Sequence, residues 1–401
     1  MIRLGYIVVT RQYLGIQGAE LERVARSLAA SGAFANPFSI PTGPTAHPAP
    51  GYTFLLGGLY ALLGNTVAAE ACKQVLAALV SAATYALLPF VAVACGFAQN
   101  IGIWAGLVGA LLPFRLINET KGNVEAPFTA ALLILLSILT VRLWRERELG
   151  TGSAIIFGLL WGLGLFFAPT FLPVLCAVFI GSAYLFRGAE RAAFARFAVI
   201  ALGCFVLVLA PWTVRNTLRL GSPVWGRDNF GLEFDLSNYD GASPRMDENK
   251  DSGHHGRLHP LYSVDEALKV REMGEVAYNR QRLATAVEWA KSHPGEFVRL
   301  TLLRGWYFWL PVSRPRVKDP MVWAITVLAF LGLWRMYASH REAALLFTAL
   351  WVAFPLVYYL IQAVPRYRYP IDWTFLILAV FGAYSFIHNS GNGRHDHTVH
   401  G

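Results

Sequence analysis

Long apolar runs alternate with polar segments along the chain, and the length of each run indicates its structure. A helix that crosses a bilayer needs about 20 predominantly apolar residues, and Val75–Cys95 and Ala343–Val364 meet that length without a charged residue. The charge-free run Thr151–Phe186 is too long for one crossing. Pro169 and Pro173 lie inside it, and because proline interrupts a helix, this run is predicted to form a helical hairpin. The pattern is typical of an all-α polytopic membrane protein.

Further runs extend this pattern to most of the chain. Some are short, but the Arg or Lys side chains that flank them can reach the membrane surface. The predicted spans are Ala68–Cys95, Ile101–Phe114, Ala126–Val141, Thr151–Ala168, Phe171–Phe186, Phe197–Val214, Pro320–Trp334, Ala343–Val364 and Trp373–Ile387. Two more apolar stretches, Tyr52–Leu63 and Phe297–Leu310, have the length and composition of re-entrant or interfacial helices.

The most polar segment of the N-terminal half is Gly18–Tyr52. Its first apolar residues recur at helical spacing, which predicts a short amphipathic helix that ends at Gly32. These residues are Leu21, Val24, Ala25 and Leu28. The preceding residues 1–10 are apolar but too few to cross a membrane, and we expect them to be the exit end of a first helix whose start is missing.

The longest polar segment is Arg215–Asp319. Its first half is rich in Gly, Asp, Asn and Ser, which is typical of irregular loop. Its second half is predicted to be one helix, Ser263–Ser292, opened by a capping box that joins Ser263 to Glu266. The helix is expected to end at His293, because a residue before proline avoids the helical region. A segment this short is predicted to cap the membrane bundle rather than form an independent domain.

Composition agrees with the membrane assignment. Hydrophobic residues make up 55% of the 401 residues and charged residues only 15%, whereas about a quarter of a soluble domain is charged. The formal net charge of +9 is explained by basic loops that mark the cytoplasmic side, so no nucleic-acid partner is expected. The four cysteines lie in or beside apolar runs without metal-type spacing, and they are predicted to pack as small hydrophobic residues.

Loop charge also predicts an orientation. Three Arg-rich loops, at 142–147, 187–196 and 335–341, are separated by even numbers of predicted spans, so all three fit the cytoplasmic side. The opposite segments then face the periplasm or exterior. They are the opening loop to Pro50, Arg115–Glu125, the tip at Pro169, Arg215–Asp319 and Pro365–Pro370.

These predictions divide the chain into five parts, from the truncated first helix with the first exterior loop to a short tail. The parts are 1–50 (first helix and first exterior loop), 51–214 (transmembrane bundle), 215–319 (exterior cap), 320–388 (C-terminal transmembrane helices) and 389–401 (cytoplasmic tail).

The first exterior loop carries the acidic residues of most interest. Glu20 lies in the first turn of the predicted helix, where the helix dipole favours a carboxylate. Glu22 lies four residues before Arg26, the spacing of an ordinary surface ion pair. His47 could bind a metal or position a substrate, although a lone histidine in a Pro-rich loop is more often structural. From spacing alone, Glu20 is equally well explained as a helix-start carboxylate with no further role.

A second group of histidines lies in the long polar segment. His254, His255 and His259 resemble a ligand set only loosely, and their Gly and Arg neighbours indicate an exposed loop. No metal ligands are therefore assigned, and the need for a divalent metal is left open.

Several segments together resemble the bacterial membrane glycosyltransferases of the protein-mannosyltransferase-like superfamily, which have the GT-C fold and use polyprenyl-phosphate-linked sugars. The segments occur in family order over nearly the whole chain. They are GAELERVARSLAASGAFANPF, GPTAHPAPGY, APWTVRN, GLEFDLSN, REMGEVAYN, SHPGEF with a following FW, and RYRYPI.

The resemblance implies roles for particular residues. The first exterior loop of this family carries an acidic residue that acts as catalytic base, and Glu20 is the position that matches. Many members have an Asp-Glu pair and a Tyr in this loop, whereas this chain has Gln17, Gly18 and Leu21. Glu22 and His47 are secondary candidates in the same loop.

The implied leaving group is a polyprenyl phosphate, which calls for fixed cations. The planar fork of arginine fits phosphate oxygens, so Arg366, Arg368 and Arg215 are the predicted phosphate-binding residues. Anchoring at the membrane interface is the alternative role of arginines at span ends. Lys121, Glu119 and Glu125, in another exterior loop, are further secondary candidates.

The function implied is transfer of a hexose or pentose, with inversion, from a polyprenyl-phosphate carrier to an exterior acceptor. The enzyme is expected to be a multi-pass protein of the bacterial inner membrane whose active site faces the periplasm. Lipid, polysaccharide and protein acceptors are all left open. The alternatives are a transporter or flippase of lipid-linked sugars and a non-catalytic family member. Charges concentrated at one membrane boundary, rather than at the midplane, favour the enzyme.

Overall fold

A computed structural model describes residues 1–15, 18–112, 116–314 and 316–392. The described chain is helical, with two isolated β-bridges and no strand in these ranges. The helices are α1 (Ile2–Thr10), α2 (Glu20–Ser31), α3 (Pro50–Leu63), α4 (Val67–Ala86), α5 (Leu88–Cys95), α6 (Gln99–Leu111), α7 (Leu116–Thr120), α8 (Ala126–Glu146), α9 (Thr151–Phe167), α10 (Phe171–Leu185), α11 (Glu190–Leu220), α12 (Phe230–Asp235), α13 (Met246–Asp251), α14 (His254–Leu258), α15 (Val264–Met273), α16 (Glu275–Ser292), α17 (Pro294–Trp309), α18 (Asp319–Ser339), α19 (Arg341–Ala353), α20 (Leu356–Leu360) and α21 (Asp372–Asn392).

Within the described residues, six segments are long and apolar enough to cross a membrane. They are Val67–Cys95, Ala126–Glu146, Glu190–Leu220, Arg316–Ser339, Arg341–Leu360 and Pro365–Phe386. Helices α3, α9 and α10 are shorter and apolar. The predicted hairpin is confirmed, because α9 ends at Phe167 and α10 begins at Phe171. The chain is thus an all-helical polytopic membrane protein, as its sequence predicts.

Close approach between long helices depends on glycine. A Cβ atom added at Gly158 of α9 would lie 2.1 Å from the carbonyl oxygen of Ala201 in α11. A Cβ atom at Gly332 of α18 would lie 2.0 Å from the carbonyl oxygen of Leu378 in α21. Small residues allow helix backbones to pack this closely in membranes, where van der Waals contact drives association.

The outer face of α11 is apolar and exposed. Val199, Leu207 and Leu218 expose 71%, 67% and 79% of their surface, although each is hydrophobic. Exposed apolar side chains along a long helix are expected where lipid replaces water as the solvent. The apolar core lies on the inner side of the bundle, where Trp144, Trp161 and Phe347 are fully buried.

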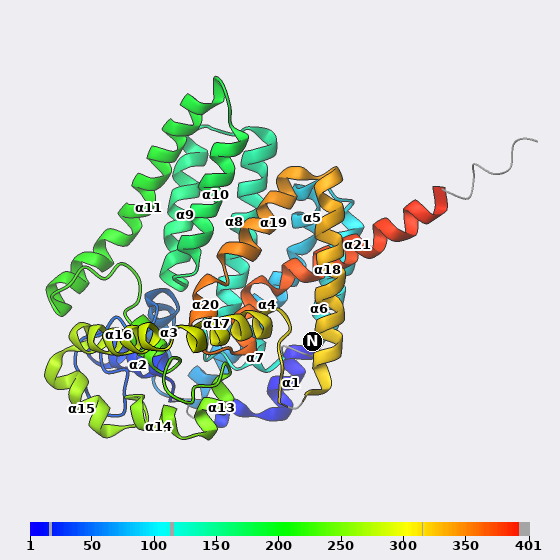
Figure 1. The fold of residues 1–401 in the computed structure, drawn as a ribbon. Coiled ribbons are helices and arrows are strands. Elements are labelled where there is room, and N and C mark those ends of the chain that lie inside the picture. The colour runs from blue at the N-terminus through cyan, green and yellow to red at the C-terminus, as the bar shows by residue number, and fades with distance from the viewer. Residues whose placement is uncertain (16–17, 113–115, 315, 393–401) are drawn as a thin grey trace, which may run out of the picture.

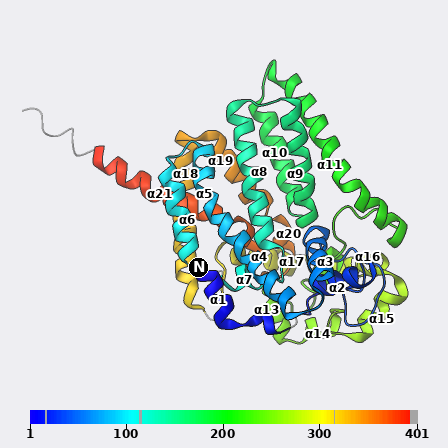
Figure 2. The same cartoon turned by 180° about the vertical axis from the view of Figure 1, so that it is seen from behind.

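A polar layer covers one end of the bundle. Figure 1 shows α2 and helices α13 to α16 side by side beneath the long helices, and Figure 2 shows the same arrangement from behind. We call residues 221–293, which contain α12 to α16, the cap. Helix α11 continues through Pro211 to Leu220 and so extends past Arg215, where the polar segment is predicted to begin.

The secondary structure of the cap corrects one expectation. The predicted helix Ser263–Ser292 is two helices, because Gly274 adopts φ +83° and ψ 149° between α15 and α16, a conformation that favours glycine. The predicted N-cap is present, since the Ser263 hydroxyl accepts a hydrogen bond from the Glu266 amide. The part predicted as irregular contains the short helices α12 to α14.

Candidate functional site

A cavity of about 450 Å³ lies where the cap meets the ends of the membrane helices. Its walls come from five segments that are far apart in the sequence. The lining residues are Ala19–Leu21 and His47–Ala49, Asn123–Ala126 with Thr129, Ala168–Thr170, Arg227, Asn229, Phe230 and Glu233, and Val357, Tyr358, Ile361, Arg366, Tyr367 and Pro370. Most of these residues belong to the loops that are predicted to face the same side of the membrane, whereas Thr129, Ala168 and residues 357–361 belong to the adjoining ends of predicted spans.

Glu20 lies at the cavity wall between two histidines. Its Oε1 atom is 3.1 Å from Nε2 of His259 and 3.3 Å from Nε2 of His47. Both imidazoles are buried, whereas the Glu20 side chain is 26% exposed. Glu20 is the first residue of α2, so the positive end of the helix dipole adds to the attraction of the two rings for its carboxylate.

These contacts change the acidity of the groups. Burial raises the pKa of Glu20, but the charges of His259 and His47 outweigh burial and lower it well below the usual value. Burial lowers the pKa of His259, but attraction to Glu20 outweighs that effect and raises it. The Glu20 carboxylate is therefore ionised at neutral pH and able to accept a proton.

Two imidazole nitrogens and one carboxylate oxygen are donors that zinc accepts, so Glu20, His47 and His259 are the residues at which a metal would bind. Their arrangement does not fit one: within the described ranges, no group of three or more His, Cys, Asp or Glu side chains has the geometry of a metal site. We therefore describe the three as an ion-paired cluster and derive no step through a metal.

The segment that carries His47 is held by α16 of the cap. The Thr45 hydroxyl donates to Glu275, and the Ala46 amide donates to the other Glu275 oxygen at 2.6 Å. Burial raises the pKa of Glu275 to about 8, although these hydrogen bonds lower it. The contacts fix the backbone next to His47, because Thr45 also accepts a hydrogen bond from the His47 amide.

Two arginines also line the cavity. Arg366 is exposed in the cavity, with its guanidinium 5.8 Å from the ring centre of Tyr367. Arg227 donates from Nε to the His47 carbonyl oxygen at 3.1 Å, and its NH1 group lies 3.9 Å from Glu125. The cavity thus presents the Glu20 carboxylate, from α2, together with guanidinium groups that can bind an anion.

Two further carboxylates face the cavity. Glu125 is 26% exposed in its wall. Glu233, from α12, lines the cavity with its Oε2 atom buried and without a hydrogen-bond partner in the described structure. A buried, unsatisfied carboxylate oxygen is costly and is available to a hydroxyl of a bound molecule.

Two of the three arginines predicted to bind phosphate do not line this cavity. Arg368 is buried, and its guanidinium donates to Asp372, Thr326 and the Trp309 carbonyl oxygen, each at 2.8 Å. Its planar fork is engaged in holding α17, α18 and α21 together, so its geometry does not support phosphate binding there.

Arg215 lies elsewhere. It lines a second cavity of about 510 Å³ between α2, α3, α9 and α11. Its guanidinium donates to the carbonyl oxygens of Thr45 and Phe34 and lies 5.0 Å from the ring centre of Trp212. The structure thus separates Arg215 from Arg366.

The secondary candidate residues also differ in whether they line the main cavity. His47 and Glu125 line the main cavity, whereas Lys121 does not. Glu119 is buried beside Arg3, with 2.9 Å between their charged groups. The predicted surface ion pair of Glu22 is wrong, because Glu22 is fully buried and pairs with Lys73 of α4 at 2.6 Å.

Three residues of the site are not among the sequence-predicted candidates. The sequence predicts an exposed loop at His259, but His259 is buried against Glu20. Glu233 and Arg227 lie in the segment interpreted as irregular. The one available signal for Glu233 was its place in GLEFDLSN, one of the segments that carry the family resemblance.

Comparisons with known proteins show the fold. No family model and no curated protein sequence matches the chain. The structure is similar to that of the apo oligosaccharyltransferase from Archaeoglobus fulgidus, with a TM-score of 0.55, 12% identity and coverage of 95% of this chain and 48% of that one. The same enzyme with an inhibitory peptide and a dolichol-phosphate gives a TM-score of 0.53, 13% identity and coverage of 94% and 47%.

A third structure of that enzyme, tethered to an acceptor peptide with the NVT sequon, gives a TM-score of 0.53 at 14% identity over 94% of this chain and 46% of that one. The chain spans about half the length of the enzyme it matches. Sequence identity of 12–14% shows similarity of fold only, and it does not show that this chain acts on the substrates of that enzyme. The chain has a helical fold similar to that of the Archaeoglobus fulgidus oligosaccharyltransferase.

Proposed function

We propose that the protein is a membrane glycosyltransferase that moves a hexose or pentose from a polyprenyl-phosphate carrier to a separate acceptor. The observation that carries the proposal is the main cavity. Glu20 and Arg366 both line this cavity, in a fold similar to that of a membrane oligosaccharyltransferase, and this supports the pairing of a base with a phosphate-binding cation.

The reaction requires loss of a proton from an acceptor hydroxyl. We assign this step to Glu20, whose carboxylate accepts the proton as the hydroxyl oxygen attacks the anomeric carbon of the sugar. The bond between that carbon and the phosphate oxygen breaks, and its electron pair leaves with the polyprenyl phosphate. Attack opposite the leaving group inverts the anomeric centre.

The leaving phosphate carries the developing negative charge. Arg366 lies in the cavity and Arg227 lies in the wall beside Glu125. Guanidinium groups stabilise phosphate oxygens through paired, charge-assisted hydrogen bonds. We assign phosphate binding to Arg366 and Arg227 in place of Arg368 and Arg215.

His259 and His47 keep Glu20 oriented and ionised. Their nitrogens lie within 3.3 Å of one carboxylate oxygen, which leaves the second oxygen to meet the acceptor. The low pKa of Glu20 ensures that the base is deprotonated at neutral pH, although it also makes the base weak.

The neighbouring structures support the same class of partners. The Archaeoglobus fulgidus enzyme has been solved with a dolichol-phosphate and with an acceptor peptide. By analogy, we propose a lipid phosphate as the carrier here. We also propose that the cavity opens to the periplasmic side of a bacterial inner membrane, because the Arg-rich loops mark the opposite side.

Proteoliposomes loaded with a panel of polyprenyl-phosphate sugars test this function against transport. The proposal predicts release of free polyprenyl phosphate from one donor, with the sugar recovered on an acceptor. Movement of intact donor across the bilayer, without release, would contradict it and favour a flippase.

A further inference from the structure

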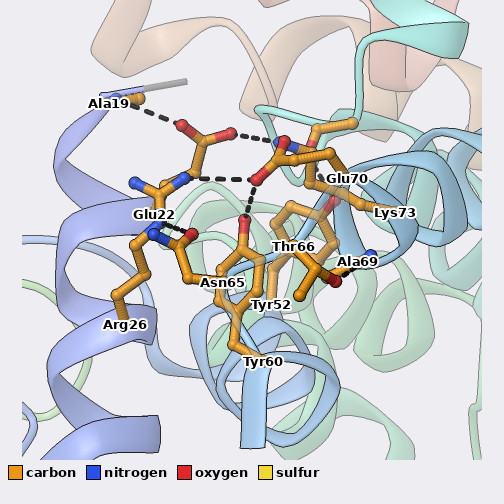
Figure 3. A network of polar contacts seen from close by, with 11 residues as sticks. Ala19, Glu22, Arg26, Tyr52, Tyr60, Asn65, Thr66, Ala69, Glu70 and Lys73 are labelled. Carbon is orange, nitrogen blue, oxygen red and sulfur yellow. Dashed lines mark hydrogen bonds and ion pairs between the residues drawn. The ribbon is translucent and has the colours of Figure 1, made fainter. Parts of the chain in front are cut away.

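A buried group of charged side chains lies behind the first turn of α2, outside the cavity. We call Glu22, Arg26, Tyr60, Glu70 and Lys73 the buried charge network. Figure 3 shows these side chains converging from α2, α3 and α4. The proposed reaction uses none of them.

Lys73 is the centre of the network. Its Nζ atom donates to Glu22 at 2.6 Å and to Glu70 at 2.5 Å. The side chains of Lys73 and Glu22 are fully buried, and that of Glu70 is 1% exposed. One ammonium group therefore holds two carboxylates, from two helices, away from solvent.

The remaining partners balance the charge. Glu70 also accepts hydrogen bonds from the Tyr60 hydroxyl at 2.9 Å and from Arg26 at 3.2 Å. Arg26 is bonded to the Asn65 side chain as well. Two carboxylates face one ammonium and one guanidinium, so the network is neutral.

The network reaches the active carboxylate through the start of α2. The N-cap residue of α2 is Ala19, whose methyl side chain cannot accept a hydrogen bond from the backbone. Glu22 reaches back instead, and its Oε2 atom accepts the Ala19 amide at 3.2 Å. Because Glu20 directly follows Ala19, the bonds from Lys73 to Glu22 and from Ala19 to Glu22 connect the network to the backbone beside Glu20.

Lys73 also supports a second wall of the cavity. Gly122 adopts φ +65°, and a Cβ atom there would lie 2.9 Å from the Lys73 side chain. The Tyr52 hydroxyl donates to the Gly122 carbonyl oxygen at 2.6 Å. This loop continues into Asn123–Ala126, which lines the cavity.

The network is poorly explained by stability alone. Taking carboxylates and an ammonium group out of water costs free energy, and well-packed apolar side chains in place of a buried ion pair are often equally or more stable. Hydrogen bonds are directional, so the bond from the Lys73 ammonium group to the Glu22 carboxylate defines the orientation of both side chains. Apolar packing does not define an orientation in this way.

We propose that Glu22 is a positioning residue that, held by Lys73, aims Glu20 into the cavity. The effect of Glu22 on catalysis rests on the proposed function. The hydrogen bond by which Glu22 holds the start of α2 does not depend on that function. Glu70 shares the ammonium with Glu22, but its hydrogen bonds join it to Lys73, Tyr60 and Arg26, whereas the Ala19 amide bonds to Glu22, so Glu70 is a matched control within the same network.

The test compares Glu22→Gln with Glu70→Gln in the full chain in nanodiscs. Each variant removes one buried carboxylate with little change in side-chain shape. Lys73 keeps the other carboxylate as its partner. In Glu22→Gln the side-chain amide has a single acceptor oxygen, so the bond to Lys73 or the bond to Ala19 is lost.

Hydrogen exchange of residues 19–23 is measured first, because it requires no substrate. Loss of a helix cap predicts about tenfold faster exchange in Glu22→Gln and a much smaller change in Glu70→Gln.

Kinetics give the second readout. Glu22→Gln is expected to lower kcat by roughly 10²-fold, the effect of a misplaced catalytic group, with little change in donor KM. Its acid limb in the pH–rate profile moves to higher pH, because Glu20 loosens from His259. The proposal would be overturned if Glu22→Gln and Glu70→Gln had equal hydrogen-exchange rates at residues 19–23 and acid limbs at the same pH. A wild-type protein that transfers no sugar would refute the proposed function, while the exchange comparison would still decide the positioning role.

Discussion

Replacing His259 by Gln tests how Glu20 is kept ionised. His259 is one of two imidazoles on the same Glu20 oxygen, at 3.1 Å, and glutamine removes its charge while keeping a polar side chain. An opposite charge at this range lowers a carboxyl pKa by about 1–3 units. Because His47 remains and Glu20 is partly exposed, we expect the variant to raise the pKa of Glu20 only part of the way toward its usual value.

The assay is the pH dependence of kcat/KM for release of polyprenyl phosphate. The acid limb should move toward neutrality, because Glu20 is protonated more readily without His259. His254→Gln is the matched control, since His254 stacks on Tyr239 at 3.4 Å between ring centres and makes no ion pair with Glu20. An active His259→Gln enzyme with an unmoved acid limb would refute the electrostatic role of His259.

The same pair makes stability depend on pH. The folded pKa of Glu20 is lowered, so its contribution is present above the usual value of 4.5 and is lost as the pH falls through the folded pKa. The folded pKa of His259 is raised, so its contribution is present below the usual value of 6.5 and is lost as the pH rises through the folded pKa. The stabilisation of the wild type over His259→Gln, measured as Tm, should therefore be greatest between these two pH values.

Further predictions follow from the positions of other residues. Arg366→Gln should weaken binding of polyprenyl phosphate by roughly 10- to 100-fold with an unchanged Tm, because it removes a charge-assisted contact worth about 1.5–3 kcal/mol; an unchanged Kd would contradict its role. Arg368→Gln should instead lower the Tm, because it removes a buried guanidinium that bonds Asp372, Thr326 and the Trp309 carbonyl oxygen, a loss of about 3–5 kcal/mol; a stable variant with weakened binding would reverse the two assignments. Cysteine placed at the exposed Asp265 of α15 should react with an impermeant reagent from outside intact cells, and protection there would contradict the proposed orientation.

Apolar patterning predicted the membrane helices because each depends on a continuous run of local sequence. The hairpin between α9 and α10, the short helix α2 and the separate cap all follow from run length, helical spacing and proline positions. The predicted exterior loops also meet, since five of them line one cavity. The tail at residues 393–401 lies outside the described ranges.

Side-chain partners were harder to predict because they depend on contacts between distant segments. Glu22 and Arg26 have the spacing of a local ion pair, but Glu22 is paired with Lys73, 51 residues away. Arg366 and Arg368 are two residues apart and equally suited to phosphate from sequence, yet only Arg366 lines the cavity. Their difference comes from Asp372, which pairs with Arg368 one helical turn later.

The most direct test of the central claim compares three carboxylates of the same cavity in one assay. Purified wild type, Glu20→Gln, Glu125→Gln and Glu233→Gln are each incubated with the polyprenyl-phosphate sugars, and release of free polyprenyl phosphate is measured. The proposed mechanism predicts release by the wild type and a loss of about 10²- to 10⁴-fold in Glu20→Gln alone, with donor binding retained. Full activity of Glu20→Gln, or a greater loss in Glu233→Gln, would contradict the assignment of Glu20 as the base.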